Sequence, residues 1–213
     1  MRHYDSDEVA ENYHKTFTSG SESSETKRRA AARYNKFISR LKKGGHVLDA
    51  GCGTGRFVRY FMSSGLQVTG IDSSISMIRR AAEENPVAVF KVMDIRHLDF
   101  PKNHFDGVWN VATLLHLNEP GVRSAVREAM RVLKGEGIMF LATRTSDKNM
   151  RKIEGSTEGG KITVNYYSPH TLEEIMISSG FEIIEMSVEP DDFSRPFDYV
   201  YALAKPSAST SGH

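Results

Sequence analysis

The stretch Val47-Leu48-Asp49-Ala50-Gly51-Cys52-Gly53-Thr54-Gly55 decides the fold of this 213-residue chain. Its first residues are apolar and predict a short buried strand, and the three glycines that follow predict a tight turn. Residues 56–62 then continue with the apolar spacing of a helix. Because glycine tolerates positive φ and has no Cβ, a ligand can lie directly against such a turn, where the N–H groups of the helix start point toward it. The stretch therefore predicts a binding site for a nucleotide-like cofactor.

The spacing of the glycines, together with two acids, narrows the choice of cofactor. The glycines fall as Gly51-x-Gly53-x-Gly55, one residue tighter than the Gly-x-Gly-x-x-Gly fingerprint of dinucleotide-binding folds. Asp49 stands two positions before the first glycine, and Asp72 follows the turn by roughly twenty residues. These features resemble the class I S-adenosylmethionine-dependent methyltransferases, in which Asp-x-Gly-x-Gly-x-Gly opens the cofactor site. The resemblance extends over residues 47–181.

Composition and charge place the chain among soluble proteins. The hydrophobic fraction of 39%, the charged fraction of 26% and the net charge of +1 are typical of one globular α/β domain. No apolar run reaches the ~20 residues that span a membrane, and the first seven residues lack the apolar core of a signal peptide. Cys52 is the only cysteine, which excludes an internal disulfide. We therefore expect a cytoplasmic protein, either a monomer or a homodimer.

Alternating strands and helices predict an α/β fold with a mostly parallel sheet covered on both faces. The resemblance implies the Rossmann-like class I fold, with seven strands in the order 3-2-1-4-5-7-6. It divides the chain into an N-terminal helical lid at residues 1–45 and an S-adenosylmethionine-binding methyltransferase domain at 46–205. Residues 206–213 are small and polar and predict a disordered tail.

Two helices are predicted before the glycine turn, at residues 6–17 and 26–41, joined by a polar linker at 19–24. By the resemblance this segment folds over cofactor and substrate, and Tyr13 is either its lid aromatic or a core tyrosine. Eight cations and no acid lie between Lys27 and Lys43. They form either a solvated face, paired with the acidic segment that precedes it, or a surface for phosphates.

Further candidates for the cofactor site stand where the second and third predicted strands end. Asp72 ends the second strand, where a carboxylate accepts hydrogen bonds from both ribose hydroxyls of a nucleoside. Ser73 and Ser74 cap the next helix. Met77 either packs on the adenine or belongs to the core. By the resemblance, Asp94 accepts a hydrogen bond from the exocyclic amine of adenine.

The resemblance also extends to the fourth strand and to the backbone near the ring. The N–H of Ile95 would meet the adenine, and Asn110 and Val111 would contact the methionine part of the cofactor. The predicted cofactor is S-adenosylmethionine, with S-adenosylhomocysteine as product. Its predicted contacts are Tyr13, Asp49, Gly51, Gly53, Gly55, Asp72, Ser73, Met77, Asp94, Ile95, Asn110 and Val111.

Residues 112–117 would lie over the reacting methyl group. His116 is a candidate general base, since imidazole titrates near neutral pH, or else a residue of the pocket wall. No His, Cys and Asp grouping has metal-ligand spacing, so no metal is expected. A long loop is predicted at 143–165, at the mouth of the site, where loops carry specificity. Tyr166 or Tyr167 either walls the pocket or belongs to the core.

Several functions remain open. The favoured one is methyl transfer by in-line displacement to an oxygen or nitrogen of a small-molecule acceptor. The alternatives are a tRNA-modifying methyltransferase of the wobble-uridine carboxymethyl type, which would use the basic segment 27–43, and a non-catalytic S-adenosylmethionine-binding protein. A nicotinamide-dependent oxidoreductase is disfavoured by the glycine spacing and by Asp94-Ile95.

Overall fold

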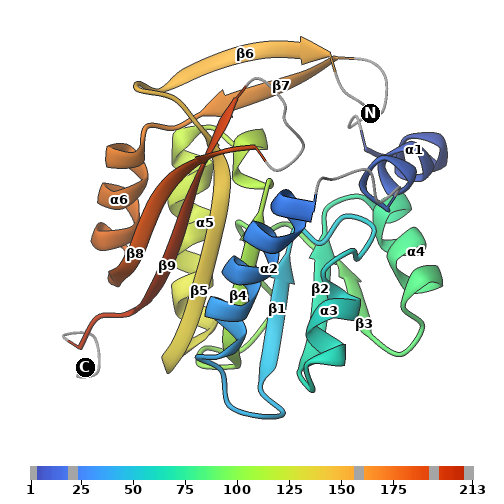
Figure 1. Ribbon diagram of the computed structural model, residues 1–213, viewed down its shortest axis with the longest axis horizontal. Helices are drawn as coiled ribbons and strands as arrows, with labels where there is room; N and C mark the ends of the chain where they lie inside the picture. Colours follow the sequence, from blue (N-terminus) through green and yellow to red (C-terminus); the bar gives the residue numbers. More distant parts are fainter. Residues whose placement is uncertain (1–3, 19–23, 156–160, 192–196, 209–213) are drawn as a thin grey trace.

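The computed structural model describes residues 4–18, 24–155, 161–191 and 197–208. A seven-stranded sheet has the order β3-β2-β1-β4-β5-β9-β8, and β6 and β7 form a separate two-stranded sheet (Figure 1). The strands are β1 His46–Ala50, β2 Gln67–Asp72, β3 Val89–Val92, β4 Phe105–Val111, β5 Leu133–Thr145, β6 Met150–Gly155, β7 Lys161–Tyr166, β8 Phe181–Pro190 and β9 Asp198–Pro206. The predicted order 3-2-1-4-5-7-6 is confirmed. Strands β6 and β7 lie outside the large sheet, so its sixth and seventh strands along the chain are numbered β8 and β9.

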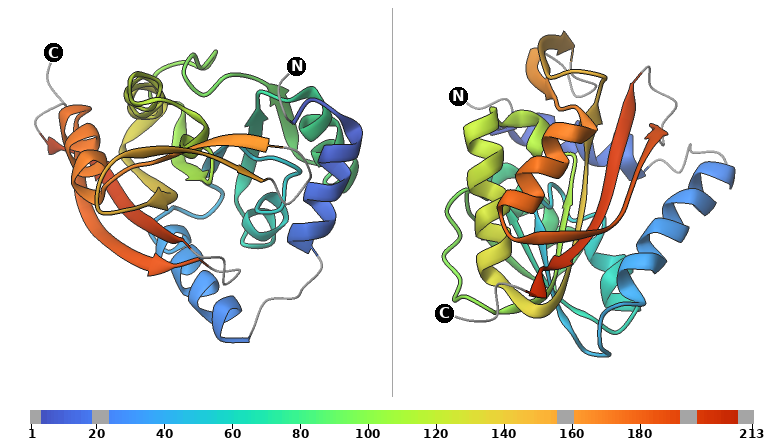
Figure 2. Two further views of the ribbon diagram at one scale, coloured as in Figure 1. Left: turned by 90° about the horizontal axis from the view of Figure 1, so that it is seen from above. Right: turned by 90° about the vertical axis from the view of Figure 1, so that its left-hand side faces the viewer.

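Helices cover both faces of the large sheet, as predicted. They are α1 Asp7–Thr18, α2 Ser24–Ile38, α3 Val58–Ser63, α4 Ile75–Glu84, α5 Glu119–Val132 and α6 Pro169–Ser178, with a 3₁₀ turn, η1, at Leu114–His116. The right-hand view of Figure 2 shows α5 and α6 on one side of the sheet and α2 and α3 on the other. Among the residues that the structure describes, no helix is long and apolar enough to cross a bilayer.

The helix starts follow from local hydrogen bonding. The hydroxyl of Ser74 accepts a hydrogen bond from the Met77 N–H at 3.2 Å and caps α4. Ser168 does the same for α6 through the Thr171 N–H at 3.1 Å, and Pro169 occupies the first turn, where its missing N–H costs nothing. The predicted caps at both helices are confirmed.

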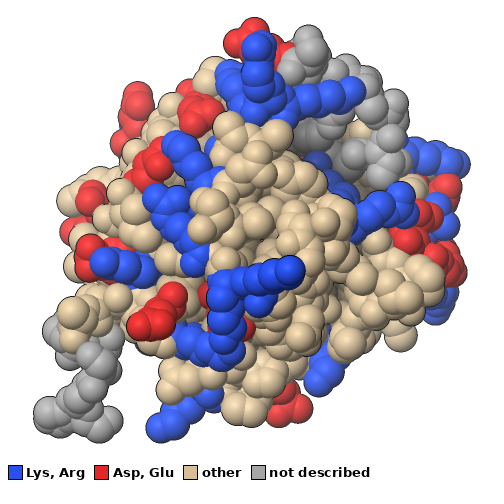
Figure 3. Space-filling model, turned by 60° about the horizontal axis from the view of Figure 1, so that its bottom comes forward, with Lys and Arg blue, Asp and Glu red and all other residues tan. Residues whose placement is uncertain are grey.

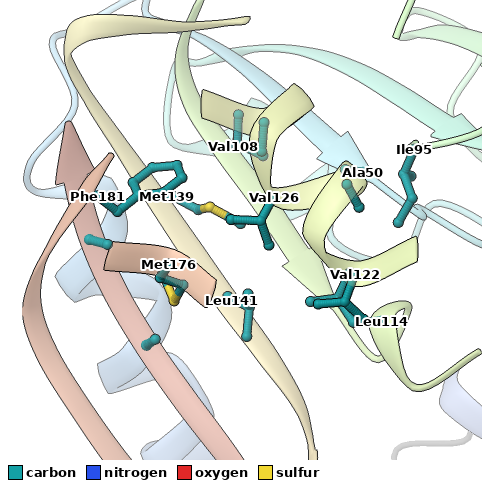
Figure 4. Close-up of a cluster of buried hydrophobic side chains, with 14 of the residues drawn as sticks. Ala50, Ile95, Val108, Leu114, Val122, Val126, Met139, Leu141, Met176 and Phe181 are labelled. Carbon is teal, nitrogen blue, oxygen red and sulfur yellow. The ribbon is translucent and has the colours of Figure 1, made fainter. Parts of the chain in front are cut away.

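One hydrophobic cluster packs the sheet against α5 and α6. Val108 and Met139 from the sheet meet Val122 and Val126 of α5 and Met176 of α6 (Figure 4). Each fully buried apolar side chain of this size contributes about 1.5–3 kcal/mol. This packing fixes the carboxyl ends of β1, β4 and β5 relative to one another, and the site is built there.

A second cluster packs the other face and is rich in aromatic rings. Trp109 of β4 stacks on Phe140 of β5 with ring centroids 4.1 Å apart. Phe37 of α2 and Phe61 of α3 close on the same tryptophan at 5.2 Å each. The apolar stripe predicted for the second helix is therefore the contact by which α2 docks on the sheet.

The prediction of a loop at 143–165 is wrong. Strand β5 continues to Thr145, and β6 and β7 pair as an antiparallel hairpin beyond it. Val164 and Tyr166 alternate along β7 and are buried with Leu115 of η1. The alternation of buried residues along β7 is short and lies among glycines and charged residues, so the sequence alone does not reveal a strand. The segment becomes a strand because it pairs with β6 in the folded protein.

Three cations of the basic segment at residues 27–43 pair with acids of the large sheet. Arg33 contacts Glu189 at 2.6 Å, Lys36 pairs with Glu185, and Lys42 contacts Asp106 at 3.0 Å. On the face shown in Figure 3, Lys and Arg are scattered among other residues rather than gathered into one patch.

Two predicted segments fall largely outside the described residues. The linker at 19–24 is described only at Ser24, which begins α2, and the tail at 206–213 only to residue 208. Strand β9 includes Pro206, one residue beyond the predicted end of the domain.

Candidate functional site

The glycine turn has backbone angles that other residues adopt only under strain. Gly51, Gly53 and Gly55 have φ of 85°, 53° and 79°. The Gly51 N–H donates a hydrogen bond to the Ile71 carbonyl at 2.8 Å and ties the turn to β2. A Cβ on Gly51 would lie 2.0 Å from the Thr113 hydroxyl oxygen. The turn therefore needs glycine here both for conformation and for space.

Asp72 is held at the carboxyl end of β2 by two backbone donors. Its Oδ2 accepts from the Gly53 N–H at 3.1 Å and its Oδ1 from the Ser74 N–H at 2.9 Å. Burial raises the pKa of the Asp72 carboxyl, and these two hydrogen bonds oppose the rise. The fold thus fixes an oriented carboxylate beside the glycine turn.

A cavity of about 690 Å³ opens in front of the turn and of Asp72. This volume lies within the usual range of small-molecule sites. Most of the predicted site residues line it, although they come from distant parts of the chain. They are Tyr13, Gly51, Gly53, Asp72, Ser73, Met77, Asp94, Ile95, Val111 and His116.

Three predicted residues are not part of the cavity wall. Asn110 donates from Nδ2 to the Ala50 carbonyl at 2.7 Å, and a Cβ on Gly55 would lie 2.8 Å from Asn85 Nδ2. Asp49 is buried in β1, and burial raises its pKa to about 7, while Arg56 opposes the rise. All three support the turn from within the fold, and their contribution to binding stays a prediction.

The Asp94 carboxylate is already paired in this structure. Arg96 Nε lies 3.0 Å from its Oδ1, Arg96 Nη2 lies 2.5 Å from its Oδ2, and the Arg96 N–H also donates to Oδ1. This pairing lowers the pKa of Asp94. Arg96 lines the cavity as well, and the sequence analysis missed it. An ionised carboxylate has further lone pairs, so Asp94 can still accept a hydrogen bond from a ligand.

The N-terminal segment lies along the cavity, next to α4. Tyr13 reaches the glycine turn, where a Cβ on Gly53 would lie 3.3 Å from its ring. Tyr4, which the sequence analysis missed, packs edge-on against Tyr13 at 6.3 Å and against His116 at 5.3 Å. Its carbonyl accepts a hydrogen bond from the Ser74 hydroxyl at 2.5 Å. The segment thus contributes aromatic side chains to the wall.

Ion pairs fasten α1 to α4. Asp7 pairs with Arg79 at 2.8 Å, and Glu11 pairs with Arg80 at 3.4 Å. These pairs are exposed to solvent, which screens them, so each adds little to stability.

Relatives identify the family. The family described as "Methyltransferase domain" matches residues 48–141. The chain is 32% identical over 179 residues to phosphatidylethanolamine N-methyltransferase of Cereibacter sphaeroides. This match covers 80% of this chain and 84% of that relative. The chain belongs to the class I S-adenosylmethionine-dependent methyltransferases. It is also 32% identical over 143 residues to 2-methyl-6-phytyl-1,4-hydroquinone methyltransferase of Synechocystis, where the match covers 65% of this chain and only 41% of the relative.

Solved structures share the fold of this methyltransferase. A methyltransferase from Clostridium acetobutylicum aligns with a TM-score of 0.72 at 12% identity, covering 93% of this chain and 98% of its own. The 1,6-didemethyltoxoflavin-N1-methyltransferase of Burkholderia thailandensis, solved with S-adenosylhomocysteine bound, aligns with a TM-score of 0.69 at 19% identity, covering 92% and 84%. At these identities the likeness concerns the fold alone.

The other half of the cavity wall in this methyltransferase comes from residues that the sequence did not single out. Strands β5, β6, β7 and β9 and helix α2 supply it, among them Arg33, Phe140, Arg144, Glu154, Lys161, Tyr199 and Tyr201. These residues are scattered over the chain with no motif spacing, so only the topology brings them together. No cluster of His, Cys, Asp or Glu suited to a metal occurs within the described residues.

Tyr166 and Tyr167 are core residues. The Tyr166 hydroxyl donates to Glu154 Oε1 at 2.5 Å and that of Tyr167 to the Leu117 carbonyl at 2.5 Å. Burial raises the pKa of each to about 12. Neither lines the cavity. Of the two roles that the sequence left open, pocket wall or core, both tyrosines therefore have the core role.

Proposed function

We propose that the cavity binds S-adenosylmethionine and that the chain transfers the methyl group to an oxygen or nitrogen of a small-molecule acceptor, releasing S-adenosylhomocysteine. The observation that carries the proposal is the Asp72 carboxylate, fixed by backbone N–H groups beside a glycine turn that leaves room for a ligand. A carboxylate at this place in an open α/β sheet binds the hydroxyls of a ribose.

The wall around Asp72 offers contacts for each part of the cofactor. Met77 and Ile95 provide apolar surface for the adenine, and Asp94 accepts a hydrogen bond from its amine. Gly51 and Val111 border the space for the methionine part. Tyr13 would cover the ribose side from the N-terminal segment.

When bound, the cofactor supplies a methyl group on a sulfonium that is already activated. The residues of the chain therefore have to position the acceptor in line with that methyl and to exclude water. Tyr4 and Tyr13 line the cavity at the N-terminal side, and the hairpin β6–β7 supplies wall at the other. His116 lines the same cavity and would take the proton of an acceptor hydroxyl or ammonium.

A small molecule suits this cavity better than an RNA. The acceptor would lie in a cavity whose wall comes from both ends of the chain. In the basic segment that would bind RNA, Arg33, Lys36 and Lys42 form ion pairs within the fold. The relatives are named for small acceptors, a phosphatidylethanolamine and a hydroquinone. A cytoplasmic location and a monomeric or homodimeric state stay predictions.

Release of S-adenosylhomocysteine from S-adenosylmethionine, followed by mass spectrometry, tests the proposal. The wild-type chain is incubated with a panel of small phenols, amines and carboxylic acids and, separately, with total tRNA. We expect acceptor-dependent release with members of the small-molecule panel and none with tRNA. Release with tRNA alone would contradict the proposal. Asp72→Ala, with the exposed Asp99→Ala as matched control, assigns the activity to this cavity.

A further inference from the structure

A row of aromatic rings lines the half of the cavity that lies away from Asp72. Phe140 of β5 is followed by Tyr201 and Tyr199 of β9 and then by Phe197, with successive ring centroids 6.4, 5.9 and 6.0 Å apart. All four residues line the cavity. Successive rings are inclined to one another by 46°, 29° and 49°, and their faces and edges offer an apolar surface on which a planar group can pack.

Two arginines stand on this row. The guanidinium carbon of Arg33 lies 4.1 Å from the centre of the Tyr201 ring, and that of Arg144 lies 3.7 Å from the centre of the Phe197 ring. Both residues are more than nine-tenths buried, with 7% of Arg33 and 9% of Arg144 exposed. We name Arg33, Phe140, Arg144, Phe197, Tyr199 and Tyr201 the arginine–aromatic subsite.

The position of Arg144 follows from the strand register. It pairs with Tyr199 across β5 and β9, so its side chain leaves the sheet on the face that carries the aromatic row. It contacts Glu154 Oε2 through one nitrogen at 2.6 Å, and its buried Nε has no hydrogen-bond partner. A guanidinium has five N–H donors in a planar fork, so a single carboxylate contact leaves donors that a ligand can use.

Each arginine of the arginine–aromatic subsite already holds one carboxylate. Arg33 contacts Glu189 at 2.6 Å and Arg144 contacts Glu154 at 2.6 Å. Because a guanidinium can donate to more than one acceptor, an anionic ligand could bind the buried Nε of Arg144 beside Glu154.

We propose that the arginine–aromatic subsite binds the methyl acceptor through an anionic group, a carboxylate or a phosphate, attached to a planar apolar body. The anion contacts Arg144, and the planar body packs on the rings that lie between Arg144 and Arg33. This inference rests on the proposed function, since it assigns the acceptor to the cavity that holds the cofactor.

Calorimetric titration of the wild-type chain saturated with S-adenosylhomocysteine tests the inference. The probes are benzoate, phenyl phosphate, benzamide and benzylamine, which share a ring and differ in charge. We expect benzoate or phenyl phosphate to bind at least about tenfold more tightly than benzamide, because hydrogen bonds to charged groups are the stronger ones. The comparison of benzoate with phenyl phosphate shows which anion the subsite takes.

Variants assign the effect to the subsite. In Arg144→Met the preference for the anionic probe falls to less than about threefold, and in the exposed Arg127→Met control it is unchanged. Since Arg144→Met strands the carboxylate of Glu154, the double variant Arg144→Met with Glu154→Gln is measured alongside. Retained binding of S-adenosylhomocysteine shows that each variant is folded.

Two results would overturn the inference while leaving the proposed function intact. The first concerns protein that holds S-adenosylhomocysteine: neither anion binds, or benzylamine or benzamide binds as tightly as benzoate and phenyl phosphate. The other is an anion preference that persists in Arg144→Met. Failure of S-adenosylhomocysteine itself to bind would remove both proposals.

Discussion

The backbone N–H of Gly53 donates a hydrogen bond to the Asp72 carboxylate, 3.1 Å away and nineteen residues further along the chain. The bond joins the glycine turn after β1 to the end of β2. It therefore fixes in one rigid unit the two features from which the cofactor was inferred. A change at either residue is expected to disturb the other.

Gly51→Ala is expected to destabilise the fold more than Gly65→Ala does. Both glycines have positive φ, 85° and 78°, so both substitutions carry strain of about 1–3 kcal/mol. Only at Gly51 does the new Cβ meet a neighbour, the Thr113 hydroxyl at 2.0 Å, whereas nothing lies within 4 Å at Gly65. Urea denaturation measures both, and the double variant Gly51→Ala with Thr113→Ala should recover part of the loss. Equal losses at the two glycines would show that the clash is absent.

Tyr13→Ala is expected to weaken binding of S-adenosylhomocysteine by about two- to tenfold, the worth of an aromatic contact. The ring lies against the turn at Gly53 and lines the cavity. Phe100→Ala is the matched control, because Phe100 packs on His104 and Phe105 and none of the three lines the cavity. Titration calorimetry gives both dissociation constants. An unchanged value for Tyr13→Ala would place the N-terminal segment outside the cofactor site.

Asp49→Asn is expected to stabilise the ligand-free protein at pH 8 and to matter little at pH 4. Burial raises the pKa of Asp49 from 3.8 to about 7, so its ionisation disfavours the folded state. The resulting loss of stability grows as the pH rises from about 4 and is complete above about 7, where it amounts to at most about 4 kcal/mol. Urea midpoints at the two pH values measure the difference between variant and wild type. A difference that does not grow with pH would contradict the raised pKa.

His116→Gln is expected to lower kcat by about 10²–10⁴-fold if the acceptor loses a proton to His116, with little change in binding of S-adenosylhomocysteine. The acidic limb of the pH–rate profile, which an imidazole base produces, should disappear with it. His104→Gln, outside the cavity wall, should leave both unchanged. A kcat within about threefold of wild type would reduce His116 to a wall residue packed on Tyr4.

Local signals sufficed for the parts of the fold that short-range chemistry determines. The alternating glycines require positive φ at their own positions, and Ser74 and Ser168 cap helices three residues away. Because parallel strands place their carboxyl ends at one edge, Asp72, Asp94 and Val111 could be assigned to one cavity before it was seen.

Other parts depended on contacts between distant segments. Strand pairing makes the hairpin β6–β7, since Ile162, Val164 and Tyr166 alternate over too few residues to be distinguished from a loop. Arg33 and Arg144 lie 111 residues apart in the numbering and face one cavity only because α2 packs on the sheet beside β5 and β9. Neither arginine belongs to a motif that spacing could reveal.

Thermal unfolding of wild type and Asp72→Ala with S-adenosylmethionine, S-adenosylhomocysteine or NAD tests the central claim most directly. A ligand at one hundred times its dissociation constant stabilises the fold by about 2.7 kcal/mol, which raises the Tm by several degrees. We predict such a rise with the two adenosyl ligands and not with NAD, and its loss in Asp72→Ala but not in Asp99→Ala. A rise with NAD alone, or one that Asp72→Ala leaves unchanged, would contradict the assignment of this cavity to S-adenosylmethionine.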